Sequence, residues 1–221
     1  MESFASRSPS GDPPVVVQVW SEGGLFTRPE LRVERVSYSV LTPTAAVGIL
    51  ESIFWKPEFR WVPVAIEVLK PIKQFLLRRN ETHDLPSLTD AATGRRRVDT
   101  VGSRDQRSAV CLKDVAYRIH AHVELREHAT KTAAAYRDQF RRRVNRGACF
   151  QQPSMGTREF PAYFGPPDDT PCHDHTEDLG LMLHRIHHTT PPSFDWFQAR
   201  LESGIMTIPL HGVRGDVPGV A

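Results

Sequence analysis

The sequence predicts an α+β protein with a ferredoxin-like N-terminal domain, a β-hairpin excursion and a smaller, mostly β C-terminal domain. The first observation is that strand-like segments of period two alternate with helical segments along residues 15–147. The second is a change after Gly147, where the chain becomes rich in proline, glycine and acidic residues. We therefore expect a flexible leader over residues 1–14, the ferredoxin-like domain over 15–147 and the β-rich domain over 148–221.

The first three elements follow from apolar spacing and from proline and glycine boundaries. A β-branched run at residues 15–20 lies between Pro14 and a glycine pair, which is typical of a buried strand. Thr42 and Pro43 form an N-cap followed by proline at the first helical position, and apolar residues at helical spacing predict a helix over 43–55. Alternation at residues 61–69 predicts a second strand.

The middle of the chain contains the excursion, another strand and a second helix. Residues 78–107 are polar and Arg-rich without either period, which predicts a long loop or flexible hairpin. Residues 116–125 alternate cleanly, so Arg118, His120 and His122 share one face of a strand. From 132 to 146 the period is helical, with Tyr136 on the core side, and Gly147 ends the helix.

Composition indicates the cellular setting. No stretch approaches ~18 uninterrupted apolar residues, and the first residues carry no apolar signal-peptide core, so we expect a soluble protein with no membrane partner. Cys111, Cys149 and Cys172 stand far apart with no Cys-x-x-Cys pair, which argues against a disulfide framework and a four-cysteine zinc site. A reducing cytoplasm fits this pattern, and no cofactor is expected.

Positive charge is concentrated in the middle of the chain. The formal net charge is only +2. However, residues 95–146 carry 14 Lys/Arg against 6 Asp/Glu, whereas residues 147–221 carry 4 against 9. Guanidinium groups match phosphate oxygens and stack on bases, so this segment suits contacts with a nucleic-acid backbone. Ordinary solvated helix and hairpin faces are the alternative explanation.

A cysteine- and histidine-rich segment in the C-terminal part has the ligand types of a zinc site. It consists of Cys172-His173-Asp174-His175, followed by His184, His187 and His188. Its spacing matches no metal-binding pattern, so we expect an exposed polar segment and no metal. Three aromatic residues, Trp20, Phe26 and Phe150, either stack on nucleic-acid bases or belong to the core.

Two blocks of ordered motifs run along the chain. The N-terminal block comprises Phe26-Thr27-Arg28-Pro29-Glu30, Val33-Glu34-Arg35-Val36-Ser37-Tyr38, Thr42-Pro43-Thr44-Ala45-Ala46, Gly48-Ile49-Leu50-Glu51 and Trp55-Lys56-Pro57. The later block comprises Arg78-Arg79-Asn80-Glu81, Asp105-Gln106-Arg107, Leu112-Lys113-Asp114-Val115-Ala116-Tyr117, Ala121-His122, Phe150-Gln151-Gln152-Pro153 and Gly156-Thr157-Arg158-Glu159-Phe160. Together they resemble the CRISPR-associated five family, Dvulg subtype, over roughly residues 15–210.

This resemblance implies a fold and a function. The fold would be a ferredoxin-like domain of the RNA-recognition type, with a protruding β-hairpin and a smaller β domain. The function would be cleavage of CRISPR repeat RNA and retention of the crRNA 5′ handle, in a complex with other type I-C surveillance subunits. Binding would use the basic helix and loops, and the expected RNA-binding residues are Arg28, Arg35, Arg107, Arg118, Arg137, Arg141, Arg142, Arg143, Arg146 and Arg158.

The residues for cleavage depart from the family pattern. Metal-independent RNA cleavage needs a base for the 2′-hydroxyl, an acid for the leaving 5′-oxygen and a cation near phosphorus. The resemblance implies a Tyr at the end of the first helix and a Lys-His pair opening the second. The matching positions hold Phe54, Ala135 and Tyr136, and Val47 stands where the family has a basic residue. The family triad is therefore not transferred.

Three other residues are the catalytic candidates. Lys131 lies about one helical turn before Ala135, Tyr136 carries an exchangeable proton, and the imidazole of His122 is a possible base. Each has a structural alternative, namely a surface charge, a core position and a hydrogen-bonded histidine, respectively. Two functions follow. The chain is either a working endoribonuclease that leaves a 2′,3′-cyclic phosphate, or a scaffold that binds a handle cut by another nuclease.

Overall fold

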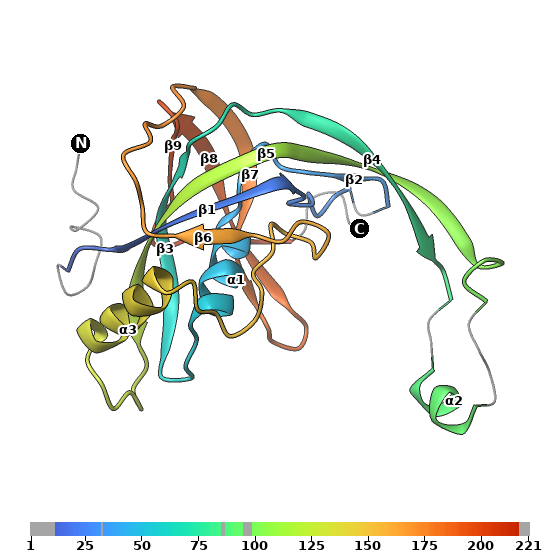
Figure 1. Ribbon diagram of the computed structural model, residues 1–221, viewed down its shortest axis with the longest axis horizontal. Helices are drawn as coiled ribbons and strands as arrows, with labels where there is room; N and C mark the ends of the chain where they lie inside the picture. The colour runs from blue at the N-terminus through green and yellow to red at the C-terminus, as the bar shows by residue number, and fades with distance from the viewer. Residues whose placement is uncertain (1–11, 32, 85–86, 95–98, 217–221) are drawn as a thin grey trace.

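Most of the chain forms strands of one curled, largely antiparallel sheet that carries two longer helices (Figure 1). The computed structural model describes residues 12–31, 33–84, 87–94 and 99–216. The elements are β1 (Val15–Gly24), β2 (Arg35–Val36), α1 (Pro43–Ile53), β3 (Phe59–Val68), β4 (Gln74–Thr82), α2 (Leu88–Thr93), β5 (Arg104–Leu125), α3 (Ala133–Asn145), β6 (Tyr163–Gly165), β7 (Glu177–His187), β8 (Ser193–Glu202), β9 (Ile205–Thr207) and β10 (Val213–Gly215). The predicted mixture of helices and strands is confirmed. Residues 1–11 of the predicted leader lie outside the described residues.

Four antiparallel strands form the centre of the sheet in the order β6-β1-β5-β3. β1 pairs with residues 112–121 of β5, and β3 pairs on the other side with residues 117–125 of β5. β6 pairs with the outer edge of β1. The strands predicted at 15–20, 61–69 and 116–125 are therefore confirmed, although β1 and β5 extend well beyond the predicted ranges.

The first half of β5 continues past this centre into a projecting two-stranded arm (Figure 1). β4 pairs with residues 104–112 of β5, and α2 lies in the connection at the far end of the arm. The predicted excursion is thus a hairpin with regular strands. An apolar cluster joins the base of this arm to the centre of the sheet. It consists of the buried residues Leu25, Ala109 and Cys111, with Phe75, Leu77 and Phe160 packed against them.

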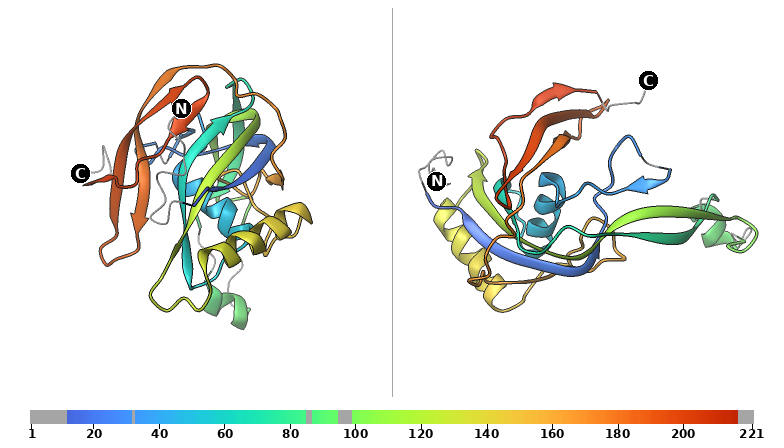
Figure 2. Two further views of the ribbon diagram at one scale, coloured as in Figure 1. Left: turned by 90° about the vertical axis from the view of Figure 1, so that its left-hand side faces the viewer. Right: turned by 90° about the horizontal axis from the view of Figure 1, so that it is seen from above.

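Both predicted longer helices form, and they pack against each other on one face of the sheet. Thr42 and Thr132 cap them, since each hydroxyl accepts a hydrogen bond of 3.3 Å from the backbone N–H three residues later. α1 lies between the central strands and β7, where the sheet curls around it, as Figure 2 shows. Trp61 of β3 packs on Phe140 of α3 with 4.7 Å between ring centroids, so this face of the sheet is the core face.

The C-terminal strands extend the same sheet. β9 pairs with β3, and β8 pairs with β9, β7 and β10. Among the described residues after Asn145 there is no further helix, which agrees with the predicted β-rich segment. The helices in the described ranges are all too short or too polar to cross a membrane.

The opposite face of the sheet carries a buried polar network. One carboxylate oxygen of Glu67 lies 2.6 Å from His120 Nε2, and the other accepts a hydrogen bond from Arg118. Arg118 also donates to the carbonyl oxygens of Asp168 at 2.8 Å and Thr170 at 2.9 Å. The predicted polar face of this strand is confirmed, but it is covered by the segment after β6 rather than exposed to solvent.

Candidate nucleic-acid interface

The end of α1 meets α3 at an aromatic cluster. Phe54 caps α1, with its N–H donating to the carbonyl oxygen of Leu50, and its ring is buried. The Phe54 centroid lies 5.5 Å from Phe59 and 6.5 Å from Tyr136. Ala135 is the neighbour of Tyr136 in the first turn of α3. Phe54, Ala135 and Tyr136, the three positions that the resemblance compares with catalytic residues, therefore lie at one place in the fold.

Arg143 and the loop after α3 hold this junction together. Arg143 Nη1 donates a 3.0 Å hydrogen bond to the carbonyl oxygen of Ile53, and its guanidinium lies over the Phe54 ring. The N–H of Phe150 donates to the Ser52 carbonyl oxygen at 2.8 Å. Carbonyl groups in the last turn of a helix lack partners within the helix, so these contacts stabilise the end of α1.

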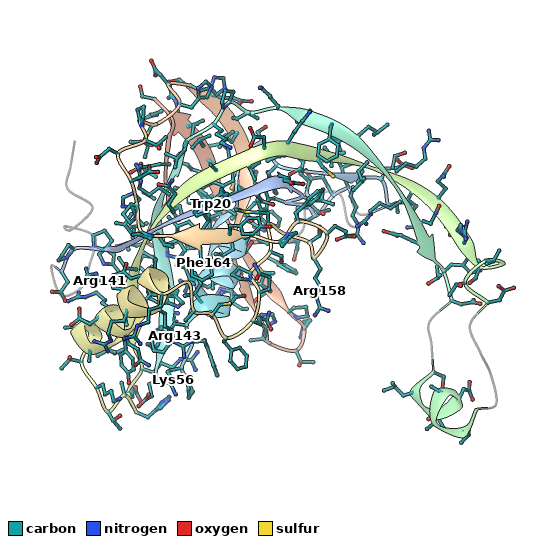
Figure 3. The ribbon with its side chains drawn as sticks, in the orientation of Figure 1. Trp20, Lys56, Arg141, Arg143, Arg158 and Phe164 are labelled. Atoms are coloured by element: carbon teal, nitrogen blue, oxygen red, sulfur yellow. The ribbon has the colours of Figure 1, made fainter. Side chains whose placement is uncertain are left out.

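Cations and exposed aromatic side chains gather around this junction. We call this area the α3 basic surface, and its members are Lys56, Arg141, Arg142, Arg143, Arg146, Trp55 and Phe150. Figure 3 shows Lys56, Arg141 and Arg143 around α3. Phe150 is 82% exposed and Trp55 is 50% exposed. Lys56, Arg142 and Arg146 are exposed, and no carboxylate in the described ranges pairs with them. Unpaired cations beside exposed aromatic rings are the components of a single-stranded RNA surface.

Two predicted RNA-binding arginines are internal ion-pair partners instead. Arg137 Nη1 lies 2.8 Å from Asp12 Oδ2, and the Arg137 side chain is 12% exposed. Arg118 is 13% exposed and is bound by Glu67 on the opposite face of the sheet. Because each guanidinium is already paired and largely buried, neither belongs to the α3 basic surface. That both contact RNA stays a prediction, and their contacts within the chain do not favour it.

Three other predicted arginines lie near β2 and the base of the arm. Arg28 lies 3.6 Å from Glu30, and Arg35 and Arg107 lie 3.5 Å and 3.8 Å from Glu81. Each keeps about a third of its side chain exposed. They are accessible to a ligand, but an RNA phosphate would compete with the carboxylates that already contact them.

Arg158 extends from a loop that packs tightly on the end of β1 (Figure 3). Leu25 N–H donates to the Met155 carbonyl oxygen at 3.0 Å. The next residue, Gly156, has φ +85°, and a Cβ there would lie 2.0 Å from the Leu25 carbonyl oxygen, so only glycine fits. Arg158 itself is exposed, with no ion pair in the described part of the chain. The loop therefore presents one accessible guanidinium.

The three catalytic candidates do not converge on one site. Lys131 and Tyr136 lie at the start of α3, on the core face of the sheet. His122 is opposite Val62 in the β3–β5 register, next to the Val123–Trp61 pair that faces α3. Since adjacent residues of a strand face opposite sides, His122 points away from α3. The sheet separates it from the other two, and we do not carry it forward as the base.

Tyr136 occupies the predicted core position. It is 2% exposed, and its ring centroid lies 4.9 Å from that of Phe59. Its hydroxyl is buried with no hydrogen-bond partner among the described residues. Burial and the neighbouring Glu58 carboxylate raise the pKa of Tyr136, so the phenol stays protonated near neutral pH. The Tyr136 hydroxyl can therefore donate a hydrogen bond near neutral pH.

For Trp20, Phe26 and Phe150 the sequence left two interpretations open, a core position or stacking on nucleic-acid bases. The structure separates the three residues. Phe26 is 3% exposed and packs edge-on against Tyr117 in the core, which excludes it from base stacking in this structure. Trp20 is 39% exposed but stacks on Tyr163, with 6.3 Å between centroids. Phe150 alone of the three predicted residues presents most of its ring to solvent. No sequence signal separated them, because all three lie beside polar residues.

The cysteine- and histidine-rich segment is held by other contacts. Cys172 Sγ donates to Glu67 at 3.3 Å, and burial together with that carboxylate raises the pKa of the thiol to about 11. His184 Nε2 donates to the Pro209 carbonyl oxygen at 2.8 Å, and His187 contacts Asp195 at 2.6 Å. Within the described residues, no group of three or more cysteine, histidine or acidic side chains is placed to bind a metal ion.

Comparisons with known proteins show which sequences this chain is similar to. A family model for the CRISPR-associated protein Cas_Cas5, subtype Cas5d, matches residues 15–207. A protein from Mannheimia succiniciproducens named CRISPR pre-crRNA endoribonuclease Cas5d is 42% identical over 87% of this chain and 93% of its own length. A protein of the same name from Thermus thermophilus is 47% identical over 76% of this chain and 70% of its own length.

Two solved structures share the fold. A CRISPR-associated protein superimposes with a TM-score of 0.65 at 22% identity, covering 89% of this chain and 91% of the other. A functionally uncharacterised protein from Streptococcus mutans superimposes with a TM-score of 0.63 at 20% identity, covering 88% and 91%. The arrangement of strands and helices is therefore one that other chains adopt.

Proposed function

This chain belongs to the Cas5d family of CRISPR-associated proteins, and from that premise we propose that it processes CRISPR repeat RNA in the bacterial cytoplasm. In this proposal it cleaves pre-crRNA without a metal ion, leaves a 2′,3′-cyclic phosphate and keeps the 5′ handle bound. It then serves as a subunit of a type I-C surveillance complex, with the other subunits as partners. The observation that carries the proposal is 42% identity, over 87% of the chain, to a relative named as a pre-crRNA endoribonuclease.

Handle binding is assigned to the α3 basic surface, with Arg158 as a further contact. The unpaired cations Lys56, Arg142 and Arg146 supply phosphate contacts, and Phe150 supplies an exposed face on which a base stacks. Three other arginines are retained as weaker contacts near the arm, because carboxylates compete for them. They are Arg28, Arg35 and Arg107.

Cleavage is assigned to the start of α3, beside the aromatic cluster at the end of α1. Lys131 is the cation for the charge that develops on phosphorus, and Tyr136 provides a buried hydroxyl close to it. The α3 basic surface lies beside this cleavage site. RNA bound on that surface therefore extends to Lys131. This assignment supports a cleavage site at the edge of the bound RNA.

We also propose that residues 15–147 form a ferredoxin-like domain of the RNA-recognition type and that residues 148–221 form a smaller β domain. The strand order β6-β1-β5-β3 supports this, with α1 connecting β1 toward β3 and α3 connecting β5 toward β6. β6 comes from beyond residue 147. One strand of the ferredoxin-like unit is therefore supplied by the segment that also forms the second domain.

A cleavage assay tests the proposed function. The purified full chain is incubated with its own repeat RNA in EDTA, and the products are analysed for length and end group. We expect cleavage at one fixed position and a 2′,3′-cyclic phosphate end. A phosphatase does not remove this cyclic phosphate, but it does remove the phosphate after acid has opened the ring. Intact RNA after prolonged incubation would exclude the nuclease.

A second candidate function has a specific observation in its favour. Phe54 and Ala135 stand where the resemblance implies catalytic Tyr and Lys residues, and neither side chain transfers protons or carries charge. A scaffold subunit that only binds a handle cut elsewhere is consistent with this. It predicts tight binding of the handle and no cleavage in the same assay.

A further inference from the structure

A carboxylate that no sequence pattern singled out lies at the proposed cleavage site. Glu58 is the last residue before β3, and its Oε1 accepts a 2.7 Å hydrogen bond from the Thr130 hydroxyl. The Glu58 carbonyl oxygen accepts from Arg126 N–H at 2.9 Å. The loop from Arg126 to Thr132, which leads from β5 into α3, is thereby closed around Glu58.

An imidazole lies on the same loop. His128 is exposed, and its Nε2 is 3.1 Å from the carbonyl oxygen of Pro57, the residue before Glu58. Because a carbonyl oxygen only accepts hydrogen bonds, Nε2 carries the proton and Nδ1 lies on the opposite side of the ring. His128 is therefore held against the backbone just before Glu58, and its Nδ1 takes no part in this contact.

Two further groups complete the surroundings of Glu58. The buried Tyr136 hydroxyl lies next to its carboxylate, and Lys131 is close enough to attract it. The hydrogen bond from Thr130, the nearby Tyr136 hydroxyl and the charge of Lys131 lower the pKa of Glu58, so it is ionised near neutral pH. The start of β3 and the loop into α3 thus bring together a carboxylate, an imidazole, an ammonium and a buried phenol.

We propose that Glu58 is the general base and His128 the general acid of RNA cleavage, an inference that rests on the proposed nuclease function. Glu58 removes the proton from a ribose 2′-hydroxyl, and the 2′-oxygen forms a bond to the adjacent phosphorus. The bond from phosphorus to the 5′-oxygen breaks, and protonated His128 gives its proton to that oxygen. The products are a 2′,3′-cyclic phosphate and a 5′-hydroxyl, with Glu58 protonated and His128 neutral until solvent restores both.

The other members of the cluster have supporting roles. Lys131 offsets the extra negative charge on the phosphoryl oxygens during the reaction. Tyr136 is a positioning residue, because its buried hydroxyl can orient Glu58 but has no access to RNA. This arrangement supplies the base, acid and cation that Phe54 and Ala135 do not.

Single-turnover cleavage of the chain's own repeat RNA in EDTA tests the assignment. The variants are Glu58→Gln, Glu58→Asp and His128→Ala, and Glu127→Gln is the matched control, because Glu127 is an exposed carboxylate on the same loop. We expect Glu58→Gln and His128→Ala to slow cleavage by about 10²- to 10⁴-fold, with the Kd for the handle changed less than about twofold. Glu58→Asp should recover part of the rate, and the control should match the wild type.

The pH dependence separates a chemical role from a structural one. Loss of Glu58 should remove the acidic limb of the rate profile. A Glu58→Gln variant that cleaves slowly but keeps the acidic limb would overturn the assignment of Glu58 as the base. A Glu58→Gln variant that cleaves at the wild-type rate would overturn it as well. In both cases the proposed nuclease function stands. A wild-type chain that binds its repeat and never cuts it would overturn the function and the assignment together.

Discussion

The guanidinium of Arg143 lies over the ring of Phe54, 5.3 Å from its centroid, on the exposed side of the α1–α3 junction. The same side chain donates a hydrogen bond to the carbonyl oxygen of Ile53. Arg143 thus stabilises the end of α1 while its charge faces the area assigned to RNA. A residue with both roles affects folding and binding together, and the two effects are separable by experiment.

Arg143→Ala should lower the free energy of unfolding by about 1–2 kcal/mol, because it removes a charged hydrogen bond to a helix end and the contact with Phe54. Arg143→Lys should recover part of this, since it keeps the charge but loses the planar contact. Urea unfolding followed by circular dichroism measures both. Arg142→Ala is the control, and as an exposed, unpaired neighbour it should change stability by less than about 0.5 kcal/mol. Equal losses in Arg142→Ala and Arg143→Ala would contradict the structural role.

Replacing both Arg142 and Arg146 by Ala should weaken handle binding and flatten its salt dependence. Each lost contact with a phosphate of single-stranded RNA reduces the slope of log K against log salt by about 0.7, so the double variant should lose about 1.4. Fluorescence anisotropy between low and moderate salt measures the slope. Arg200→Ala is the control, because the Arg200 side chain on β8 is 63% exposed, and it should leave the salt slope unchanged. An unchanged slope in the double variant would place the RNA path elsewhere.

Local patterns in the sequence were sufficient to predict the two longer helices, α1 and α3, and the central strands β1, β3 and the second half of β5. The Thr42-Pro43 boundary and the apolar spacing that follows it depend only on neighbouring residues, and α1 begins at Pro43 as predicted. Helical spacing likewise placed Tyr136 and Phe140 in the core. The length of β5 was not predicted, because its first half gains regularity only by pairing with β4 in the arm.

Local patterns could not predict which charged side chains are accessible to RNA and which are paired within the chain. Arg118 on a polar strand face and Arg137 on a basic helix gave no local sign that they differ from the accessible Arg142, but Glu67 and Asp12 reach them from distant parts of the chain. Alternation placed His122 on a polar face without showing that α3 packs on the other one. Glu58 was missed because a lone carboxylate before a strand has no motif, and only the loop folded around it reveals the site.

Phe150→Ala should reduce handle affinity without changing the salt slope. Stacking of a base on an aromatic ring contributes about 1–3 kcal/mol, so we expect the Kd to rise by about 5- to 150-fold. The ring is 82% exposed, and its removal should leave the unfolding transition in place. Val213→Ala is the matched control, because Val213 is 77% exposed on β10, away from α3. A wild-type Kd for Phe150→Ala would show that the ring does not touch RNA.

Glu67 should make the stability of the fold depend on acid. Burial alone would raise its pKa, but the hydrogen bond and charge of His120, the Cys172 thiol and Arg118 lower the pKa to about 2. The folded-state pKa is therefore below the ordinary value of 4.5, so the stabilisation is complete above pH 4.5 and is lost as the pH falls toward 2. The difference corresponds to about 3 kcal/mol.

Urea unfolding at several pH values from 7 down to 3 measures this contribution. Glu67→Gln should be less stable than the wild type by about 3–5 kcal/mol at pH 7, because it removes the carboxylate that contacts both His120 and Arg118 and leaves Arg118 only the longer contact with Asp168. The gap should narrow as the wild type is acidified, since protonated Glu67 also carries no charge. Glu202→Gln, at a side chain 73% exposed, should follow the wild-type curve. A gap that stays constant from pH 7 to 3 would show that the buried pair with Arg118 does not hold the Glu67 carboxylate ionised.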